Sequence, residues 1–327
     1  MISLYGASRL AAGLLVFKVH TVTAYADPEI CSGSCWAHDP ALIQRASDGL
    51  YFRFNTDTYV DIKTSTSLSG PWTDAGSVLP SGSIATESGS TGLWAPAVIN
   101  KDGSYHLYYS VSTLSSQDSL IAAATSNTLE EGSWTDHGSI GLTSTSGSPY
   151  NAIDPTVNEV DGTYYLSFGS YWHNIYQITL GTKALAITAT PTNNIQYQPS
   201  GNHNAEAPSI YLYSGYYYLF WSEGQANRYD TAKPAAGGEY KVRVCRSSAI
   251  GGPYVDSSGT SCTDGGGEYV LESHGNVYGP GAQGIIDDPT YGSVMYYRYV
   301  NTTIGYAVAD YQWGWNVIDW SSGWPVI

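Results

Sequence analysis

Three carboxylate residues stand beside proline at corresponding points of the chain. Asp39 and Asp154 each directly precede a proline, and Glu206 lies two residues before Pro208. An Asp before Pro is a common turn opener, so one such residue alone would indicate only a turn. Carboxylates gathered in a confined site repel one another, and at least one pKa rises, which suits a group that must stay protonated. A protonated carboxyl opposite an ionised one is the pair that hydrolyses a glycosidic bond.

The prolines belong to a pattern that occurs five times. Each copy has an X-Pro step, a short β run, a turn and an aromatic strand, as in Trp94-Ala95-Pro96 followed by residues 102–103 and 105–109. The prolines are 53 to 72 residues apart, a period that fits one four-stranded sheet per repeat. Radial repetition of such sheets is a β-propeller, whereas a β-sandwich would not repeat the same order five times. The sequence therefore predicts an all-β, single-domain, five-bladed β-propeller.

The X-Pro positions should form a ring, because the innermost strand of each propeller blade lines the central channel. We expect those strands to begin near the ring residues and the closure of the propeller to bring the chain ends together. Glu206 precedes one ring residue, so three blades would place a carboxylate at the mouth of one funnel. The ring residues read from the five copies are Asp39, Ala95, Asp154, Ala207 and Gly279.

Aromatic and histidine residues accompany two ring positions. Trp94 directly precedes the second ring residue, Trp36 lies just ahead of His38, and His38 is next to Asp39. Flat rings at such places could stack on a sugar face, and the histidine could orient the carboxylate. The plain alternative is packing, because stacked blades bury Tyr and Trp in quantity and this chain has 10 Trp and 29 Tyr.

The charge of the chain argues against nucleic acid as a partner. Its 28 acidic and 13 basic side chains give a formal net charge of −15, and phosphate backbones are bound through clustered Lys and Arg. A charged fraction of 13% with 42% hydrophobic residues also argues against intrinsic disorder. The composition is that of a large, acidic, Tyr-rich globular protein, and the charge says little about its substrate.

The first 26 residues have the pattern of a secretory signal peptide. Arg9 precedes an apolar run over residues 10–17, and the segment ends in Ala24-Tyr25-Ala26, although a first strand is the rival interpretation. No other run approaches the roughly 20 apolar residues of a membrane helix. We expect residues 27–327 to be a secreted, extracellular catalytic domain that does not enter a membrane.

Four cysteines form two pairs that are close in sequence. In an exported chain we expect the disulfides Cys31–Cys35 and Cys245–Cys262, since the spacing lacks the paired CxxC pattern of a zinc site. The sequon Asn301-Thr302-Thr303 also agrees with secretion.

The motifs together resemble glycoside hydrolase family 43 and, within it, the fungal endo-1,5-α-L-arabinanases. The resemblance implies an inverting hydrolase on a five-bladed propeller, with Asp39 as general base and Glu206 as general acid. It implies that Asp154 raises the pKa of the acid and orients it. The motifs are residues 31–40, 93–96, 151–155, 205–209 and 278–281, and the sugar-binding residues expected are Trp94, His38, Asn151 and Trp36.

The same resemblance sets expectations for cofactors and partners. No cofactor is required; the family often has a channel calcium held partly by a histidine after Gly-Pro-Gly, where this chain has Ala282-Gln283. Gln283 could still offer an oxygen, so a calcium ion in the central channel stays open. The expected partner is arabinan, a pectin side chain, or an arabino-oligosaccharide, acted on by a monomer. The alternatives are an exo-acting arabinofuranosidase or β-xylosidase, a non-catalytic carbohydrate-binding propeller and a protein-interaction propeller.

Overall fold

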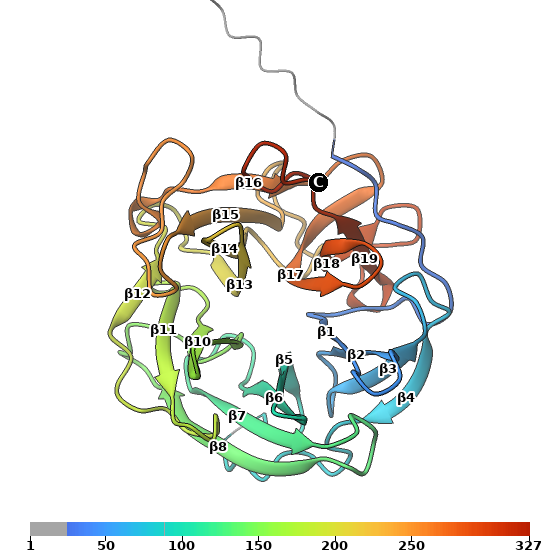
Figure 1. Cartoon of the computed structure of the whole chain (residues 1–327). Helices are drawn as coiled ribbons and strands as arrows, with labels where there is room; N and C mark the ends of the chain where they lie inside the picture. The colour runs from blue at the N-terminus through green and yellow to red at the C-terminus, as the bar shows by residue number, and fades with distance from the viewer. Residues whose placement is uncertain (1–24, 88) are drawn as a thin grey trace, which may run out of the picture.

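Five antiparallel sheets surround one central axis, so the molecule is a five-bladed β-propeller, as predicted (Figure 1). The computed structural model describes residues 25–87 and 89–327. The expected signal peptide lies outside the described residues except for Tyr25 and Ala26. No helix in the described part of the chain has the length and apolar character needed to cross a membrane.

Four of the sheets have four strands and the last has three. Within each sheet the strands follow one another in chain order from the axis outward. The first blade consists of β1 (Ala41–Gln44), β2 (Tyr51–Asn55), β3 (Asp61–Ser65) and β4 (Thr73–Ser77). The second consists of β5 (Leu93–Lys101), β6 (Ser104–Val111), β7 (Ser119–Ser126) and β8 (Thr135–Ser144). The third consists of β9 (Thr156–Val160), β10 (Thr163–Phe168), β11 (Ile175–Leu180) and β12 (Asn193–Gln196).

The fourth and fifth blades complete the ring, with two short 3₁₀ helices between strands. The fourth consists of β13 (Ala205–Tyr213), β14 (Tyr216–Glu223), β15 (Lys241–Ser247) and β16 (Glu268–Leu271), with η1 (Cys262–Asp264) before the last strand. The fifth consists of β17 (Val277–Asp288), β18 (Gly292–Asn301) and β19 (Tyr311–Val317), with η2 (Val308–Asp310) before the last strand.

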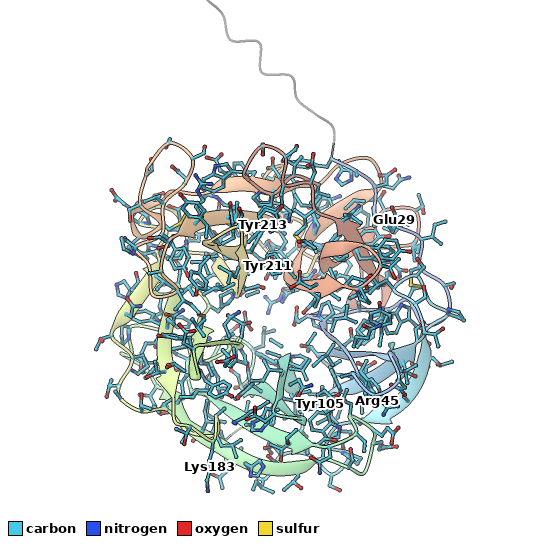
Figure 2. All side chains as sticks on the ribbon, in the orientation of Figure 1. Glu29, Arg45, Tyr105, Lys183, Tyr211 and Tyr213 are labelled. Atoms are coloured by element: carbon cyan, nitrogen blue, oxygen red, sulfur yellow. A yellow bond between two sulfur atoms is a disulfide. The ribbon has the colours of Figure 1, made fainter. Side chains whose placement is uncertain are left out.

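The hydrophobic core lies between neighbouring blades. The middle strand β6 is buried over nearly its whole length, whereas the outer strand β8 alternates exposed and buried residues, as a strand with one face in water does. Phe52 and Phe54 of the first blade share one buried cluster with Leu107 and Tyr109 of the second. Side chains fill these spaces between the blades (Figure 2). The abundant aromatic residues therefore serve mainly to pack blade against blade.

The propeller closes through the start of the chain. Residues 29–37, here named the strap, run along β19: Glu29 donates its N–H to the Trp315 carbonyl at 3.0 Å, and Trp313 donates to Cys35 at 2.8 Å. Trp36 also forms an antiparallel bridge with Gln312. The strap thus supplies the missing fourth strand position of the last blade, and the described chain ends lie near each other, as expected (Figure 1).

Every blade presents its ring residue in the same unusual backbone conformation. Asp39, Ala95, Asp154 and Ala207 have φ angles of 43°, 42°, 57° and 53°, the left-handed region that costs a residue with a side chain about 1–3 kcal/mol. The narrow end of the channel is lined by these four residues and the prolines that follow them. Asp39 and Asp154 stand two residues before β1 and β9, whereas Ala95 and Ala207 lie at register shifts inside β5 and β13, so the conformation recurs near the start of each of these innermost strands.

The fifth ring residue is Ala282 rather than Gly279, so this expectation was wrong. Ala282 has the left-handed φ of 51°, and Ala282 and Gln283 line the channel. Gly279 instead packs under Tyr229, whose hydroxyl would lie 2.6 Å from a Cβ there. Two register shifts in β17 insert the extra residues that move the ring position. The last blade lacks a ring proline, and the sequence pattern followed Pro280 instead.

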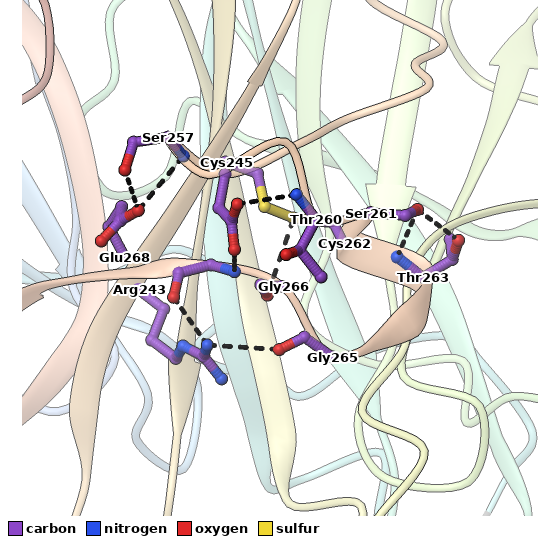
Figure 3. Close-up of a disulfide and its surroundings, with 12 residues drawn as sticks. Arg243, Cys245, Ser257, Thr260, Ser261, Cys262, Thr263, Gly265, Gly266 and Glu268 are labelled. Atoms are coloured by element: carbon purple, nitrogen blue, oxygen red, sulfur yellow. Dashed lines mark hydrogen bonds between the residues drawn. A yellow bond between two sulfur atoms is a disulfide. The ribbon is translucent and has the colours of Figure 1, made fainter. Parts of the chain in front are cut away.

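Both expected disulfides are present, which removes the zinc alternative, because no described cysteine is free. Cys31–Cys35 lies in the strap. Cys245 of β15 and Cys262 of η1 are fully buried, and their bridge ties the loop before β16 to the sheet (Figure 3).

Candidate active site

The three carboxylates predicted from the sequence line one cavity at the channel mouth. It has a volume of about 910 Å³, and residues of all five blades contribute to its wall. Asp39, Asp154 and Glu206 are more than fifty residues apart in sequence, and the ring brings them together. Burial in one confined space is the condition under which neighbouring carboxylates alter one another's pKa.

Asp39 is surrounded by the Arg298 cation, the Thr56 hydroxyl and the imidazole of His38, whose own pKa is lowered by burial. Thr56 Oγ1 donates to Asp39 Oδ2 at 2.9 Å, His38 Nε2 lies 3.6 Å from the same oxygen, and Arg298 Nε lies 3.6 Å from Oδ1. Burial by itself would raise the pKa of Asp39, but His38, Arg298 and the Thr56 hydroxyl outweigh it and lower this pKa below its ordinary value of 3.8. Asp39 is therefore held as a carboxylate.

Glu206 has the opposite environment. It lies on β13, beside a register shift between Glu206 and Ser209 that interrupts the regular pairing with β14. Burial raises the pKa of Glu206 above its ordinary value of 4.5, and hydrogen bonds from Ser170 to Oε2 at 2.6 Å and from Tyr240 to Oε1 at 2.9 Å oppose this only in part. Glu206 therefore retains a proton to higher pH than an exposed glutamate does.

Asp154 is the most strongly perturbed of the three carboxyl groups. Burial raises its pKa well above 3.8, and the charges of Glu206 and Asp39 raise it further. Its Oδ2 accepts a hydrogen bond from the Ala207 N–H at 3.2 Å, next to Glu206 in sequence. The repulsion between Asp154 and Glu206 is mutual, so the two groups titrate as a pair and resist being ionised together.

A hydroxyl group from the preceding blade braces several ring positions. Ala95 donates its N–H to Thr56 Oγ1 at 2.7 Å, Asp154 donates to Ser110 Oγ at 2.9 Å, and Ala282 donates to Ser222 Oγ at 2.9 Å. Thr56, Ser110 and Ser222 lie at or near the ends of the second strands. These bonds join the first blade to the second, the second to the third and the fourth to the fifth, and they help to hold the ring residues in place.

Arg298 is a site residue that the sequence pattern did not single out. It lies on β18, is 1% exposed, lines the cavity and carries a cation whose pKa is raised despite burial. Its guanidinium stacks on the rings of Tyr240 and Tyr311, at 4.9 and 4.5 Å from the ring centres. The sequence signal that could have identified Arg298 is an arginine within an otherwise aromatic strand. This signal is ambiguous, because Arg53 has the same kind of position and instead donates a hydrogen bond to Ser34 of the strap.

Ser170 and Tyr240 were also missed, although they hold both oxygens of Glu206. Burial and the charge of Glu206 raise the pKa of Tyr240 well above 10, so its hydroxyl remains a donor. Ser170 follows the aromatic strand β10, and Tyr240 precedes β15 after a long loop. Neither position repeats from blade to blade, so the sequence offered no pattern by which to find them.

Three of the four expected sugar-binding residues line the cavity, namely Trp94, His38 and Asn151. Trp36 is not among the lining residues. Its Nε1 donates to the Val308 carbonyl at 2.9 Å, and its ring meets the edge of His38 at a centre distance of 6.4 Å. Trp36 thus packs behind His38 and supports it rather than facing the cavity.

The cavity rim differs in chemistry from side to side. Leu114, Tyr171 and Trp172, from the second and third blades, are 61%, 39% and 38% exposed, so they offer apolar surface to the cavity. Residues 224–240 of the fourth blade, here named the wall loop, add the polar Asn227 and the exposed Arg228 to the cavity lining. Such a groove can contact both the apolar faces and the hydroxyl groups of a sugar chain.

The channel residues do not fit a protein-built calcium site. Gln283 Oε1 accepts from Ser222 Oγ at 2.7 Å and its Nε2 donates to the Ala207 carbonyl at 2.9 Å, so both ends of the amide are engaged. Among the described residues, no three His, Cys, Asp or Glu side chains are arranged to hold a metal ion. Calcium takes about six to eight oxygen ligands, which this set does not supply.

The chain is a five-bladed propeller that brings three carboxyl groups to one cavity, and such a fold and site are typical of a propeller hydrolase. The chain belongs to glycosyl hydrolases family 43, whose model matches residues 34–325.

Curated relatives and solved structures agree with this assignment. Arabinan endo-1,5-alpha-L-arabinosidase A of Aspergillus niger is 54% identical over 314 residues, which cover 96% of this chain and 97% of that protein. The Aspergillus aculeatus enzyme of the same name is 52% identical over 97% of this chain and 98% of its own. A Bacillus subtilis arabinanase has a similar structure, with a TM-score of 0.78 and 28% identity over 90% of this chain and 99% of that chain. The structure of an exo-1,5-alpha-L-arabinanase from a bovine ruminal metagenomic library is also similar, with a TM-score of 0.76. It is 28% identical over 89% of this chain and 96% of that chain.

Proposed function

We propose that this protein hydrolyses internal α-1,5-L-arabinofuranosidic bonds of arabinan with inversion of configuration. The observation that carries the chemistry is the opposite perturbation of two carboxyl groups in one cavity: the pKa of Asp39 is lowered and that of Glu206 is raised. Environments that push two carboxyl pKa values apart assign the base and the acid. The substrate follows from curated relatives at 52–55% identity, all arabinan endo-1,5-alpha-L-arabinosidases.

In the proposed reaction, the ionised Asp39 removes a proton from a water molecule. That water attacks the anomeric carbon of the sugar on the face opposite the leaving oxygen. The protonated Glu206 gives its proton to the leaving oxygen as the glycosidic C–O bond breaks. Single displacement from the opposite face inverts the anomeric configuration, so no covalent sugar–enzyme intermediate forms.

Asp154 has a different task in this proposal. Its negative charge, when present, disfavours ionisation of Glu206, and its acceptance of the Ala207 N–H fixes the backbone next to the acid. Asp154 is therefore a positioning residue, and its repulsion with Glu206 disfavours the state in which both groups are ionised. Arg298 does the converse for Asp39, because a buried cation close to the base favours its charged form.

The substrate-binding roles are argued from the cavity wall. Trp94 offers an aromatic surface beside a ring position, and His38 and Asn151 offer polar atoms near the base and near Asp154. Arabinan is an essentially neutral polymer, so the net charge of −15 has no part in recruiting it. We infer that sugar rings lie against Trp94 while their hydroxyl groups meet the polar lining.

The test is a product profile on linear, debranched arabinan. An endo-acting enzyme releases oligosaccharides of many lengths at once and lowers the viscosity early, whereas an exo-acting enzyme releases one short product from the beginning. The similarity to an exo-arabinanase structure makes this the main alternative. A protein that binds arabinan without releasing sugar would be a non-catalytic binding propeller.

Two variants separate catalysis from binding. Glu206→Gln should lose about 10²- to 10⁴-fold in kcat on arabinan while still binding it, because general acid help is removed and the amide keeps the shape. An aryl arabino-oligosaccharide with a good leaving group should be hydrolysed far better by this variant, whereas Asp39→Asn should fail on both substrates. Glu159→Gln, at an exposed position of β9, is the matched control. Full activity of both catalytic variants would contradict the proposal.

We also infer that the protein is exported and acts as a monomer. Two disulfides and fungal relatives support an extracellular location, since disulfides persist in oxidising surroundings. Expression in a fungal host tests export, which retention of the protein in the cytosol would contradict. Light scattering of the purified protein tests the monomer, which a dimer mass would contradict.

A further inference from the structure

The sequon is a sequence motif that catalysis leaves unexplained. Asn301-Thr302-Thr303 is the single Asn-x-Ser/Thr motif of the chain. Asn301 is the last residue of β18, and the loop that follows leads to η2. The corresponding loops of the second, third and fourth blades reach the cavity, so this loop lies at the same end of the propeller. None of its residues lines the cavity itself.

The side chains of the sequon are arranged in a turn at the surface. Asn301 Oδ1 accepts hydrogen bonds from the Thr303 N–H at 3.0 Å and from Thr303 Oγ1 at 2.7 Å. The amide oxygen is thereby held by Thr303, the third residue of the sequon. Thr303 is exposed and Asn301 is only half-buried, so the sequon lies at the surface of the molecule.

The loop that begins at the sequon also exposes apolar side chains. Ile304 is 56% and Val308 is 41% exposed, within seven residues of Asn301. The backbone around them is fixed, because Val308 accepts from Trp36 of the strap and the neighbouring Tyr306 contacts Lys233 of the wall loop. Apolar surface that cannot move away from water is a site at which a bulky hydrophilic cover increases solubility.

We propose that Asn301 carries an N-linked glycan that covers Ile304 and Val308 and flanks the cavity without entering it. In the transfer, the Asn301 amide nitrogen forms a bond to the anomeric carbon of a polyprenyl-diphosphate-linked oligosaccharide. The bond from that carbon to the phosphate oxygen breaks, the lipid diphosphate leaves, and the amide proton passes to a base of the transferase. The inference depends on export and on the surface geometry, not on the catalytic proposal.

The experiment is peptide mapping of the full chain secreted from a yeast that glycosylates sequons. Treatment with peptide-N-glycosidase in ¹⁸O-water should remove the added mass and leave labelled aspartate at position 301. Thr303→Ala should abolish the modification, whereas Thr302→Ala should retain it, because Asn-Ala-Thr is still a sequon. Unmodified Asn301 in the secreted wild type, from cells that modify a co-expressed reporter glycoprotein, would overturn the proposal; this outcome needs no variant to fold.

A second measurement tests the covering role. Asn301→Gln should aggregate faster than the glycosylated wild type on mild heating, and adding Ile304→Thr and Val308→Thr should remove that difference. Activity on arabinan per folded molecule should be equal in all these proteins, since Asn301 is outside the site. Equal aggregation of Asn301→Gln and wild type would overturn the covering role.

Discussion

Arg298 Nε lies 3.6 Å from Asp39 Oδ1, and the same guanidinium stacks on Tyr240, whose hydroxyl donates to Glu206. One buried cation therefore contacts the proposed base directly and the proposed acid through an aromatic partner. It also donates to the Ala226 carbonyl of the wall loop. Arg298 thus connects proton chemistry to the cavity wall, although it needs no contact with the bond that breaks.

Replacing this cation should change the acidic limb of the pH–rate profile. In Arg298→Met the pKa of Asp39 rises, because a positive charge beside it is lost, so activity should fall off at a pH about one unit higher or more. The measurement is kcat/KM against pH on arabino-oligosaccharides. Arg246→Met, which also removes an arginine packed on aromatic rings, is the control and should leave the limb in place. An unchanged limb in Arg298→Met would argue against the electrostatic role.

Removal of Asp154 should act on the opposite limb. Activity requires protonated Glu206, so it is lost as pH rises through the pKa of this group. Because the repulsion that raises the pKa of Asp154 acts on both groups, we expect Asp154→Asn to lower the pKa of Glu206 and to move the alkaline limb to lower pH. The exposed Asp161→Asn serves as control. A shift to higher pH would mean that Asp154 stabilises the ionised acid instead.

The wall loop should be sensitive to Lys233. Its ammonium lies 4.4 Å from the ring centre of Tyr278 and 4.1 Å from that of Tyr306, which fastens the loop to the fifth blade. An exposed cation–π contact contributes about 0.5–1 kcal/mol, so Lys233→Met should raise KM for arabinan by about two- to fivefold. kcat on short oligosaccharides should change little. Lys183→Met, an exposed lysine far along the third blade, should have no effect on either constant.

The two disulfides should contribute unequally to stability. In the chain-entropy model, closing the 17-residue separation of Cys245 and Cys262 is worth about 3 kcal/mol, and closing the separation of 4 between Cys31 and Cys35 about 2 kcal/mol. Replacing each pair with alanine and measuring unfolding in guanidinium should give this order. The reverse order would show that contacts of the strap, rather than loop closure, dominate.

The blades could be predicted from the sequence because each repeat contains a proline, a turn and an aromatic strand in the same order. The same logic located Asp39 and Asp154, which stand at ring positions. It failed at the last blade, where Ala282-Gln283 takes the place of an X-Pro step and Pro280 misled the alignment. A pattern that depends on proline does not detect a position at which the backbone conformation is the same but the proline is absent.

The partners of the carboxylates could not be predicted, because they come from loops that differ between blades. Ser170 and Tyr240 hold Glu206 from two such loops, and the wall loop has no counterpart of equal length. Trp36 shows the converse limit. Its place near His38 in sequence suggested a sugar contact, yet the strap turns its ring toward Val308.

The left-handed ring residues have a consequence for redesign. The five blades have five equivalent ring positions, of which two are aspartate and three are alanine. Ala95 and Ala207 already accept a backbone that asparagine and aspartate tolerate better than alanine does. Aspartate or asparagine could therefore be introduced at these alanine positions one at a time, which would add polar groups around the axis without a change of backbone conformation.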